Sequence, residues 1–210
     1  MTTPGEYGDA PLDGALVVVA GGAGRVGGGV VAAALAAGAR VVVPVRPEDD
    51  LTHLPDHPHL TVEQADVSDE AAARALAARL GSVDHVFASI GAWWQGNRIP
   101  DIALDDWDDA IASRLRPHIV AMSALLPVVR GSYTVVAGDT LERPVRRAAP
   151  TSVVAAAVLG LARAADKDTE DVRVHAIILS ALDETRTPAT VGAAWLGLAL
   201  DAQAPVELRV

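Results

Sequence analysis

Three glycines spaced three residues apart follow the first apolar run of the sequence. The segment reads AGGAGRVGGG and lies between a Val-rich stretch and an Ala-rich one. A turn that brings backbone amides against a pyrophosphate tolerates no Cβ atom at its tightest points, and the helix beyond it offers free N–H groups and a positive dipole end. The pattern therefore predicts a dinucleotide-binding turn rather than a simple Gly- and Ala-rich corner. Its contact residues would be Gly21, Gly24, Arg25, Val26 and Gly27.

An arginine ends the second Val-rich run, RVVVPVR. An NAD-specific site places a carboxylate at this point for the ribose 2′-hydroxyl. Arg46, with Arg25 as a second cation, instead favours NADP(H) over NAD(H), because guanidinium groups bind phosphate with paired hydrogen bonds. Acidic residues at 48–50 weaken this field, and a solvated strand-end role for Arg46 is the alternative.

Short β-branched runs alternate with Ala-rich segments of helical length along the chain. The periodicity predicts strands at 16–20, 40–45, 60–66, 83–89, 132–138, 172–179 and 206–210. It predicts helices over 26–37, 70–80, 107–129 with a bend at Pro117, 152–165 and 189–200. Strands that alternate with crossover helices form a parallel sheet, so we expect an α/β fold with one doubly wound sheet of about seven strands and helices on both faces. Ligands of such sheets bind at the carboxyl ends of the strands.

The length and composition of the chain limit which kinds of protein it can be. A chain of 210 residues fits one domain, which we place at 15–210 behind a flexible tail at 1–14. The net charge of −10 argues against nucleic acid and anionic membranes as partners, and the lack of cysteine excludes disulfides and thiolate chemistry. Three histidines at 53–59 are separated by prolines, which favours a polar loop over a metal site. Without a signal peptide or a long apolar run, we expect a cytoplasmic protein.

From Leu16 to Val210 the chain resembles the short-chain dehydrogenase/reductase family. AGGAGRVG stands where the family has its glycine motif, and VVVPVRPEDDL is similar to its second strand with an NADP-reading arginine. The resemblance implies a Rossmann-type domain that binds NAD(P). In ADVSDEAAARAL it implies adenine contacts for Asp66 and Val67. In VDHVFASIGA it implies ribose contacts for Ser89, Ile90 and Gly91, although the family's asparagine is missing there.

The catalytic half departs from the family's Asn, Ser, Tyr and Lys tetrad. Laid on the family pattern, the four positions are taken by Arg114, Gly138, Thr151 and Ala155. Neither of the two tyrosines has a basic residue four positions later, so no register restores Tyr-x-x-x-Lys. A threonine hydroxyl has no accessible pKa near neutrality, so Thr151 can orient a substrate but cannot replace the tyrosine in proton transfer.

Other polar residues near the same strand ends offer substitutes. Asp139 follows the strand at 132–138, while Arg114 and His118 lie four residues apart and thus on one face of a helix. Together they can polarise and protonate a carbonyl or imine near a hydride donor. A surface loop with a helix salt bridge is the alternative. Lys167 is expected beyond the helix at 152–165, on the surface.

The region of the substrate pocket is also altered. Trp93 and Trp94 follow the strand at 83–89, and they either wall a pocket or fill a structural contact. Only about ten residues separate the strand at 172–179 from the last helix, which implies a shortened lid and a more open pocket. By resemblance, Thr187 stands where a threonine touches the nicotinamide amide.

Three functions fit these observations. The first is an NADP(H)-dependent oxidoreductase for a small carbonyl or imine, with non-standard acid/base residues. The second is a catalytically inactive dinucleotide-binding sensor or partner subunit. The third is a non-redox isomerase or cyclase in which Asp139 or His118 carries a proton.

The helix at 152–165 is apolar on nearly every face. By resemblance, the family pairs this helix with the helix at 107–129 in a four-helix contact. We therefore expect a homodimer or homotetramer.

Overall fold

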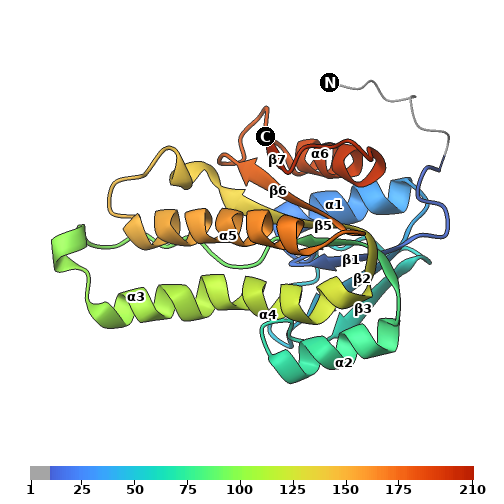
Figure 1. Ribbon diagram of the computed structural model, residues 1–210, viewed down its shortest axis with the longest axis horizontal. Helices are drawn as coiled ribbons and strands as arrows, with labels where there is room; N and C mark the ends of the chain where they lie inside the picture. Colours follow the sequence, from blue (N-terminus) through green and yellow to red (C-terminus); the bar gives the residue numbers. More distant parts are fainter. Residues whose placement is uncertain (1–9) are drawn as a thin grey trace.

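The computed structural model of the chain describes residues 10–210, and its centre is a sheet of seven strands (Figure 1). The strands are β1 (Leu16–Ala20), β2 (Arg40–Val45), β3 (Leu60–Gln64), β4 (Val83–Ala88), β5 (Val129–Gly138), β6 (Arg173–Leu179) and β7 (Glu207–Arg209). Their order across the sheet is β3-β2-β1-β4-β5-β6-β7, and every neighbouring pair is parallel. The predicted doubly wound parallel sheet is confirmed.

The chain reverses its direction of travel across the sheet at β1. Val18 of this strand pairs with Val42 of β2 on one side and with Val86 of β4 on the other. The chain first moves outward from β1 to β3 and then crosses back to continue from β4. Connections that leave the carboxyl ends of β1 and β4 therefore diverge, and such a switch point opens a crevice at this edge of the sheet.

Helices cover both faces of the sheet (Figure 1). They are α1 (Arg25–Ala36) and α6 (Pro188–Leu200) on one face, and α2 (Glu70–Leu80), α4 (Arg116–Leu125) and α5 (Ala149–Asp168) on the other. Side chains of β1 alternate between the two cores, because Val17 and Val19 belong to the α1/α6 core whereas Val18 and Ala20 belong to the opposite one. Each Val-rich strand is thus buried on both sides, as parallel strands between helices are.

The helices α1 and α6 approach each other at backbone distance. A Cβ atom at Gly29 would lie 1.9 Å from the carbonyl oxygen of Pro188, and one at Gly192 would lie 2.3 Å from the carbonyl oxygen of Gly29. Glycine is required at both positions for this packing. Next to the contact, the Trp195 side chain is fully buried against the sheet.

The helix predicted over 107–129 consists of several pieces. Helix α3 (Leu104–Ala110) leads into a π-helical turn at Ile111–Leu115, then into α4, and a 3-10 turn at Leu126–Val128 precedes β5. Pro117 lies in the first turn of α4 and has no N–H to donate to the preceding turn, so the irregularity lies just before the proline, where a bend was predicted. Strand β5 begins at Val129 rather than at residue 132.

Part of the predicted flexible tail is packed. Residues 1–9 lie outside the described part of the chain, but Leu12 is 4% exposed and its N–H donates to the carbonyl of Ala37 at 2.8 Å. Gly38 also approaches Asp13 closely. Residues 10–14, which the sequence predicts as part of a flexible tail, thus contribute Leu12 to the core under α1.

Helix α5 is longer at both ends than the predicted 152–165. It begins at Ala149, with Pro150 in the first turn, where a missing N–H costs nothing. Lys167, expected beyond the helix, lies in its last turn; its side chain is 83% exposed and pairs with Asp166. Among residues 10–210, every helix is too short or too polar to span a membrane.

Candidate functional site

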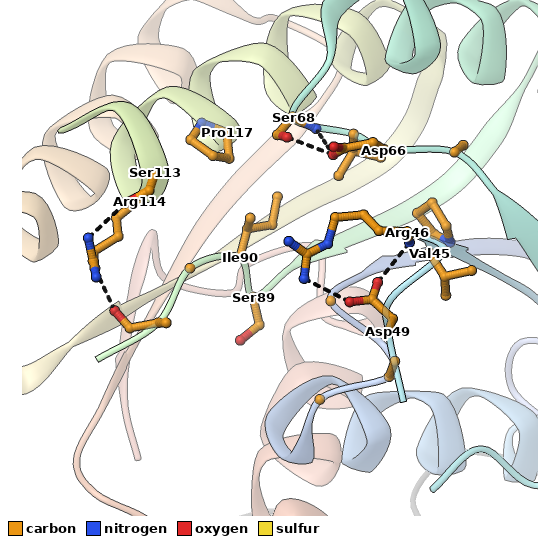
Figure 2. A pocket seen from close by; sticks show the side chains of 18 of the residues that line it. Val45, Arg46, Asp49, Asp66, Ser68, Ser89, Ile90, Ser113, Arg114 and Pro117 are labelled. Atoms are coloured by element: carbon orange, nitrogen blue, oxygen red, sulfur yellow. Dashed lines mark hydrogen bonds and ion pairs between the residues drawn. The ribbon is translucent and has the colours of Figure 1, made fainter. Parts of the chain in front are cut away.

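A cavity of about 530 Å³ opens at the carboxyl edge of the sheet, at the switch point beside β1 (Figure 2). Its wall comes from the segments that follow β1, β2, β3 and β4, and from the π-helical turn with the start of α4. Eight of the eleven residues predicted to contact a dinucleotide line it: Gly21, Gly24, Arg46, Asp66, Val67, Ser89, Ile90 and Gly91. Among the residues predicted to act in catalysis, Arg114 lines it as well.

The turn after β1 has room only for glycine at two points. Gly21 has φ +80°, and a Cβ atom there would lie 2.1 Å from the carbonyl oxygen of Ser89. A Cβ atom at Gly27 would lie 2.2 Å from the carbonyl oxygen of Gly21. The turn, the first turn of α1 and the segment after β4 are therefore in backbone contact, which forms the cradle that a pyrophosphate needs.

The N-terminus of α1 points at this cradle. Gly24 is the residue before the helix and offers no capping side chain, so the first N–H groups of α1, those of Arg25, Val26 and Gly27, have no partner within the helix. Unpaired N–H groups and the positive end of the helix dipole together favour an anion. The Arg25 side chain is exposed, and its residue lies outside the cavity wall.

Arg46 and Asp49 form a tight pair at the β2 end of the cavity (Figure 2). The guanidinium donates to Asp49 Oδ1 at 2.7 Å, and the Arg46 backbone N–H donates to Asp49 Oδ2 at 2.8 Å. The hydrogen bond to Asp49 raises the pKa of Arg46. Partial burial works against ionisation of Asp49, but the hydrogen bonds from Arg46 outweigh it and lower the pKa of this carboxyl. Glu48 lies 3.4 Å from the same guanidinium.

The segment after β3 supplies a fixed wall. Asp66 Oδ1 accepts hydrogen bonds from the backbone N–H of Ser68 at 2.8 Å and from its hydroxyl at 2.6 Å. Val67 between them is 8% exposed and belongs to the core. Both Ser68 bonds go to Oδ1, and Asp66, Val67 and Ser68 all line the cavity.

Two side chains that are four residues apart in sequence hold the segment after β4. His118 Nε2 lies 2.9 Å from the carbonyl oxygen of Ile90, and Arg114 Nε donates to the carbonyl oxygen of Ala92 at 2.9 Å. His118 is 2% exposed, and burial lowers its pKa to about 4. The histidine is thus neutral at neutral pH and donates from Nε2. This geometry does not support the proton-carrying role predicted for His118.

Thr151, which takes the tyrosine position by resemblance, is bonded to the loop after β4. Its hydroxyl donates to the carbonyl of Trp94 at 2.8 Å and accepts from the N–H of Trp94 at 3.2 Å. Two further bonds join this loop to the approach to α5, from Gln95 to the carbonyl of Arg146 and from the N–H of Gly96 to the carbonyl of Arg147. Ala155, in the lysine position, is buried and only 6% exposed.

The two tryptophans of this loop differ. Trp94 packs on Gly96, where a Cβ atom would lie 2.7 Å from the indole ring. Trp94 also lines a smaller hollow with Asp106 and Arg114, whereas Trp93 is 55% exposed. Neither tryptophan lines the cavity beside β1, so Trp94 packs within its own loop and the expected pocket wall stays a prediction.

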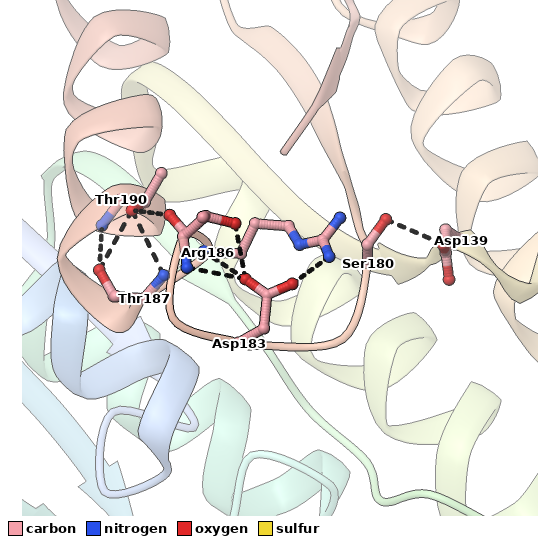
Figure 3. A network of polar contacts seen from close by, with 7 residues as sticks. Asp139, Ser180, Asp183, Arg186, Thr187 and Thr190 are labelled. Atoms are coloured by element: carbon pink, nitrogen blue, oxygen red, sulfur yellow. Dashed lines mark hydrogen bonds and ion pairs between the residues drawn. The ribbon is translucent and has the colours of Figure 1, made fainter.

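Asp139 and Ser180 meet at the carboxyl ends of β5 and β6 (Figure 3). The Ser180 hydroxyl donates to Asp139 Oδ2 at 2.8 Å. Asp139, Ser180 and Thr151 all lie outside the cavity wall, whereas Arg114 lies on it.

The loop at 180–187 is short and held by its own side chains (Figure 3). Asp183 accepts from the N–H groups of Thr185 and Arg186, from the Thr185 hydroxyl and from the Arg186 guanidinium. These bonds, that from the Arg186 backbone first, hold the pKa of Asp183 well below its usual range. Thr187 is the residue before α6 and caps this helix, because its hydroxyl accepts from the N–H of Thr190 at 3.3 Å.

Sequence reasoning missed several residues of the cavity. Pro44, Val45, Asp49, Ser68, Ala92, Ala112, Ser113 and Pro117 line it besides the predicted ones, together with Ala23 and Ala65. For Asp49 a signal was present, since acidic residues follow Arg46 directly. For the π-helical turn none was, because its contact with the sheet depends on tertiary packing. Nowhere in residues 10–210 do three His, Asp or Glu side chains gather as metal ligands.

The comparisons with known proteins agree with this architecture. A family model described as "Enoyl-(Acyl carrier protein) reductase" matches residues 21–207. A crystal structure from Brucella melitensis, titled short-chain dehydrogenase/reductase SDR:Glucose/ribitol dehydrogenase, is similar with a TM-score of 0.82 and 20% identity over 95% of each chain. At this identity the likeness concerns the fold. A search of curated proteins finds no match.

Proposed function

Because the chain belongs to the short-chain dehydrogenase/reductase family, we propose that it binds NADP(H) in the cavity beside β1. Dinucleotide binding is the general property of the family, and the choice of NADP(H) is the finer part of the proposal. The observation that carries it is the glycine cradle at the N-terminus of α1, with the Arg46 guanidinium on the same cavity wall.

The described residues fit the parts of this cofactor. Gly21 and Gly27 leave space for a pyrophosphate, and the N–H groups at the start of α1 would bind it. Asp66 and Val67 would hold the adenine, and Arg46 would face the phosphorylated ribose. When bound, the nicotinamide supplies or takes up a hydride.

The groups that would move a proton are altered. The Thr151 hydroxyl donates its only hydrogen to the carbonyl of Trp94 and also accepts from the N–H of Trp94, and Ala155 brings no charge. We therefore propose that the protein holds the cofactor without the family's Tyr–Lys proton transfer, as a dinucleotide sensor or a partner subunit.

The Asp139–Ser180 pair favours a second candidate, reduction of a small carbonyl or imine. A carboxyl held by a serine hydroxyl lies at the carboxyl ends of β5 and β6, where the family has its chemistry. In this candidate Arg114, which lines the cavity, would polarise the substrate, and the proton for the reduced product would pass through the Asp139–Ser180 pair outside the cavity wall. A non-redox isomerase or cyclase would use the same carboxyl.

Fluorescence titration with NADPH, followed by assays of hydride loss with a panel of carbonyls and imines, tests both candidates. Binding without turnover supports the sensor or subunit. Turnover that disappears in Asp139→Asn supports the reductase. In Arg46→Ala we expect NADPH to bind at least tenfold more weakly, since a charge-assisted contact is lost. Unchanged affinity in this variant contradicts the choice of NADP(H).

A further inference from the structure

The cavity beside β1 is built from one half of the chain. Every residue of its wall lies between Gly21 and Pro117 in the sequence, and none comes from the segments after β5 and β6. The wall in Figure 2 is accordingly formed around the ends of β1, β2, β3 and β4 and by the start of α4. Sheets of this kind bind a dinucleotide across the switch point, with one mononucleotide on each half of the sheet. The half at β5 and β6 lies outside this cavity.

The loop after β4 forms the end of the cavity wall. Gly91 and Ala92 line the cavity, and Arg114 Nε donates to the Ala92 carbonyl at 2.9 Å. The next part of the loop lies outside the wall, where both the N–H and the carbonyl of Trp94 are bonded to Thr151 of α5. The wall therefore reaches the segment after β4 and goes no further toward α5.

The polar side chains at the ends of β5 and β6 are bonded to one another (Figure 3). The Ser180 hydroxyl donates its hydrogen to Asp139 at 2.8 Å. The Asp183 carboxylate accepts from Thr185 and from Arg186 within its own loop. A nicotinamide carboxamide would have to compete with these bonds, and groups that are already paired contribute little to binding a ligand. This edge of the sheet thus uses its polar groups to hold the protein's own loops.

We propose that the cavity recognises the ADP-ribose part of the dinucleotide and leaves the nicotinamide in solvent. The class of ligand is then an adenine nucleotide with a 5′-diphosphate chain, whether or not it carries a nicotinamide. The inference rests on the proposed binding of NADP(H) in this cavity and extends its first candidate, the sensor. A ring in solvent has no fixed position for hydride transfer.

A matched pair of ligands tests this inference on the parent chain. NADPH and 2′-phospho-ADP-ribose differ only in the dihydronicotinamide, which a hydroxyl replaces in the second ligand. Calorimetric titration should give affinities that agree within about threefold, because a ring in solvent adds little to the binding free energy. Acrylamide should quench the nicotinamide emission of bound NADPH nearly as strongly as that of free NADPH, since the ring stays accessible to water.

Two substitutions of a carboxylate locate the contacts. Asp66 lines the cavity, whereas Asp183 lies in the loop at 180–187 and outside the wall. Asp66→Asn should weaken both ligands equally, by about tenfold, the loss that corresponds to one charge-assisted hydrogen bond. The matched control Asp183→Asn should change neither affinity. Thermal unfolding checks that each variant is folded, and the ligand pair and the quenching need no variant.

Four results would each overturn the inference and leave binding of NADP(H) standing. They are affinities of the two ligands that differ by more than about threefold, protection of the nicotinamide from acrylamide, loss of affinity for NADPH alone in Asp183→Asn, and unchanged affinities in Asp66→Asn. Equal affinities that fall together in Asp66→Asn support it. If neither ligand binds to the parent chain, the proposed function fails and the inference fails with it.

Discussion

Thr151 and Trp94 are joined twice, because the threonine hydroxyl donates to the carbonyl of Trp94 and accepts from its N–H. The residue in the family's tyrosine position thus holds a loop. We expect Thr151→Val to destabilise the protein by about 1–2 kcal/mol, since two backbone groups lose their partner. Hydrogen exchange at the Trp94 amide should rise in Thr151→Val and stay slow in Thr151→Ser, which keeps the hydroxyl. Equal exchange in both variants would show that the bonds do not hold the loop.

Gly21→Ala should abolish NADPH binding. Its Cβ would overlap the carbonyl of Ser89, and φ +80° is strained for alanine, so the turn must open where the pyrophosphate would bind. Gly197→Ala in α6 is the control, because a Cβ atom there meets nothing within 4 Å and alanine favours a helix. Isothermal titration measures the affinity, and circular dichroism reports the fold. If Gly21→Ala binds NADPH as the parent does, the cradle lies elsewhere.

Acid should unfold the protein through its buried histidines. Burial lowers the pKa of His118 to about 4 and, with Arg173 nearby, that of His85 to about 4. The unfolded chain binds these protons near pH 6.5 and the folded chain does not. Stability is therefore complete above pH 6.5 and falls as the pH drops toward 4, by about 1.4 kcal/mol per pH unit for each histidine.

Urea unfolding at several pH values between 4 and 7 measures this loss. In His118→Gln, whose amide can still donate to the Ile90 carbonyl, the slope of stability against pH should fall by about a third to a half, because His85 and His175, whose pKa values burial also lowers, continue to titrate. The exposed His53 provides the control, since His53→Gln removes a histidine from the surface. A slope that His118→Gln does not change would contradict the assignment.

The face formed by α4 and α5 is expected to join two copies of the chain, and light scattering after size exclusion should give a dimer or tetramer at micromolar concentration. Ile119 is 43% exposed and Val153 is 51% exposed, and a groove lined by Met122 and Leu161 lies between the two helices. Val153→Asp should produce monomers, because it places a charge in the apolar contact. Leu51→Asp, at a site that is 38% exposed beyond β2, should leave the assembly unchanged. A monomeric parent chain would contradict this proposal.

The parts of the site that the sequence predicts are those encoded locally. The glycine turn depends on residues within one segment. The Val-rich strands and Ala-rich helices follow from periodicity, so their order along the chain and the parallel pairing of the strands could be inferred. Arg46 was noted for the same reason, at the end of a recognisable strand. The π-helical turn could not be inferred, because periodicity indicates only that Pro117 disturbs a helix.

Contacts between distant segments could not be predicted. The Thr151–Trp94 bonds join residues 57 positions apart, and the Ser180–Asp139 bond joins residues 41 apart. Each depends on how two loops meet at the sheet edge. The four-residue spacing of Arg114 and His118 predicts only that they share one face of a helix. That this face meets the loop after β4, and that the histidine is buried, depend on tertiary packing.

The backbone contact between Gly29 and α6 links the two ends of the fold. Gly29 lies one turn after the glycine cradle, and it packs against Pro188 and Gly192, which the ribosome adds more than 150 residues later. The core that holds α1 against the sheet, with Trp195 in it, is incomplete until then. During synthesis, β1 and α1 therefore emerge long before the residues of α6 that complete their core.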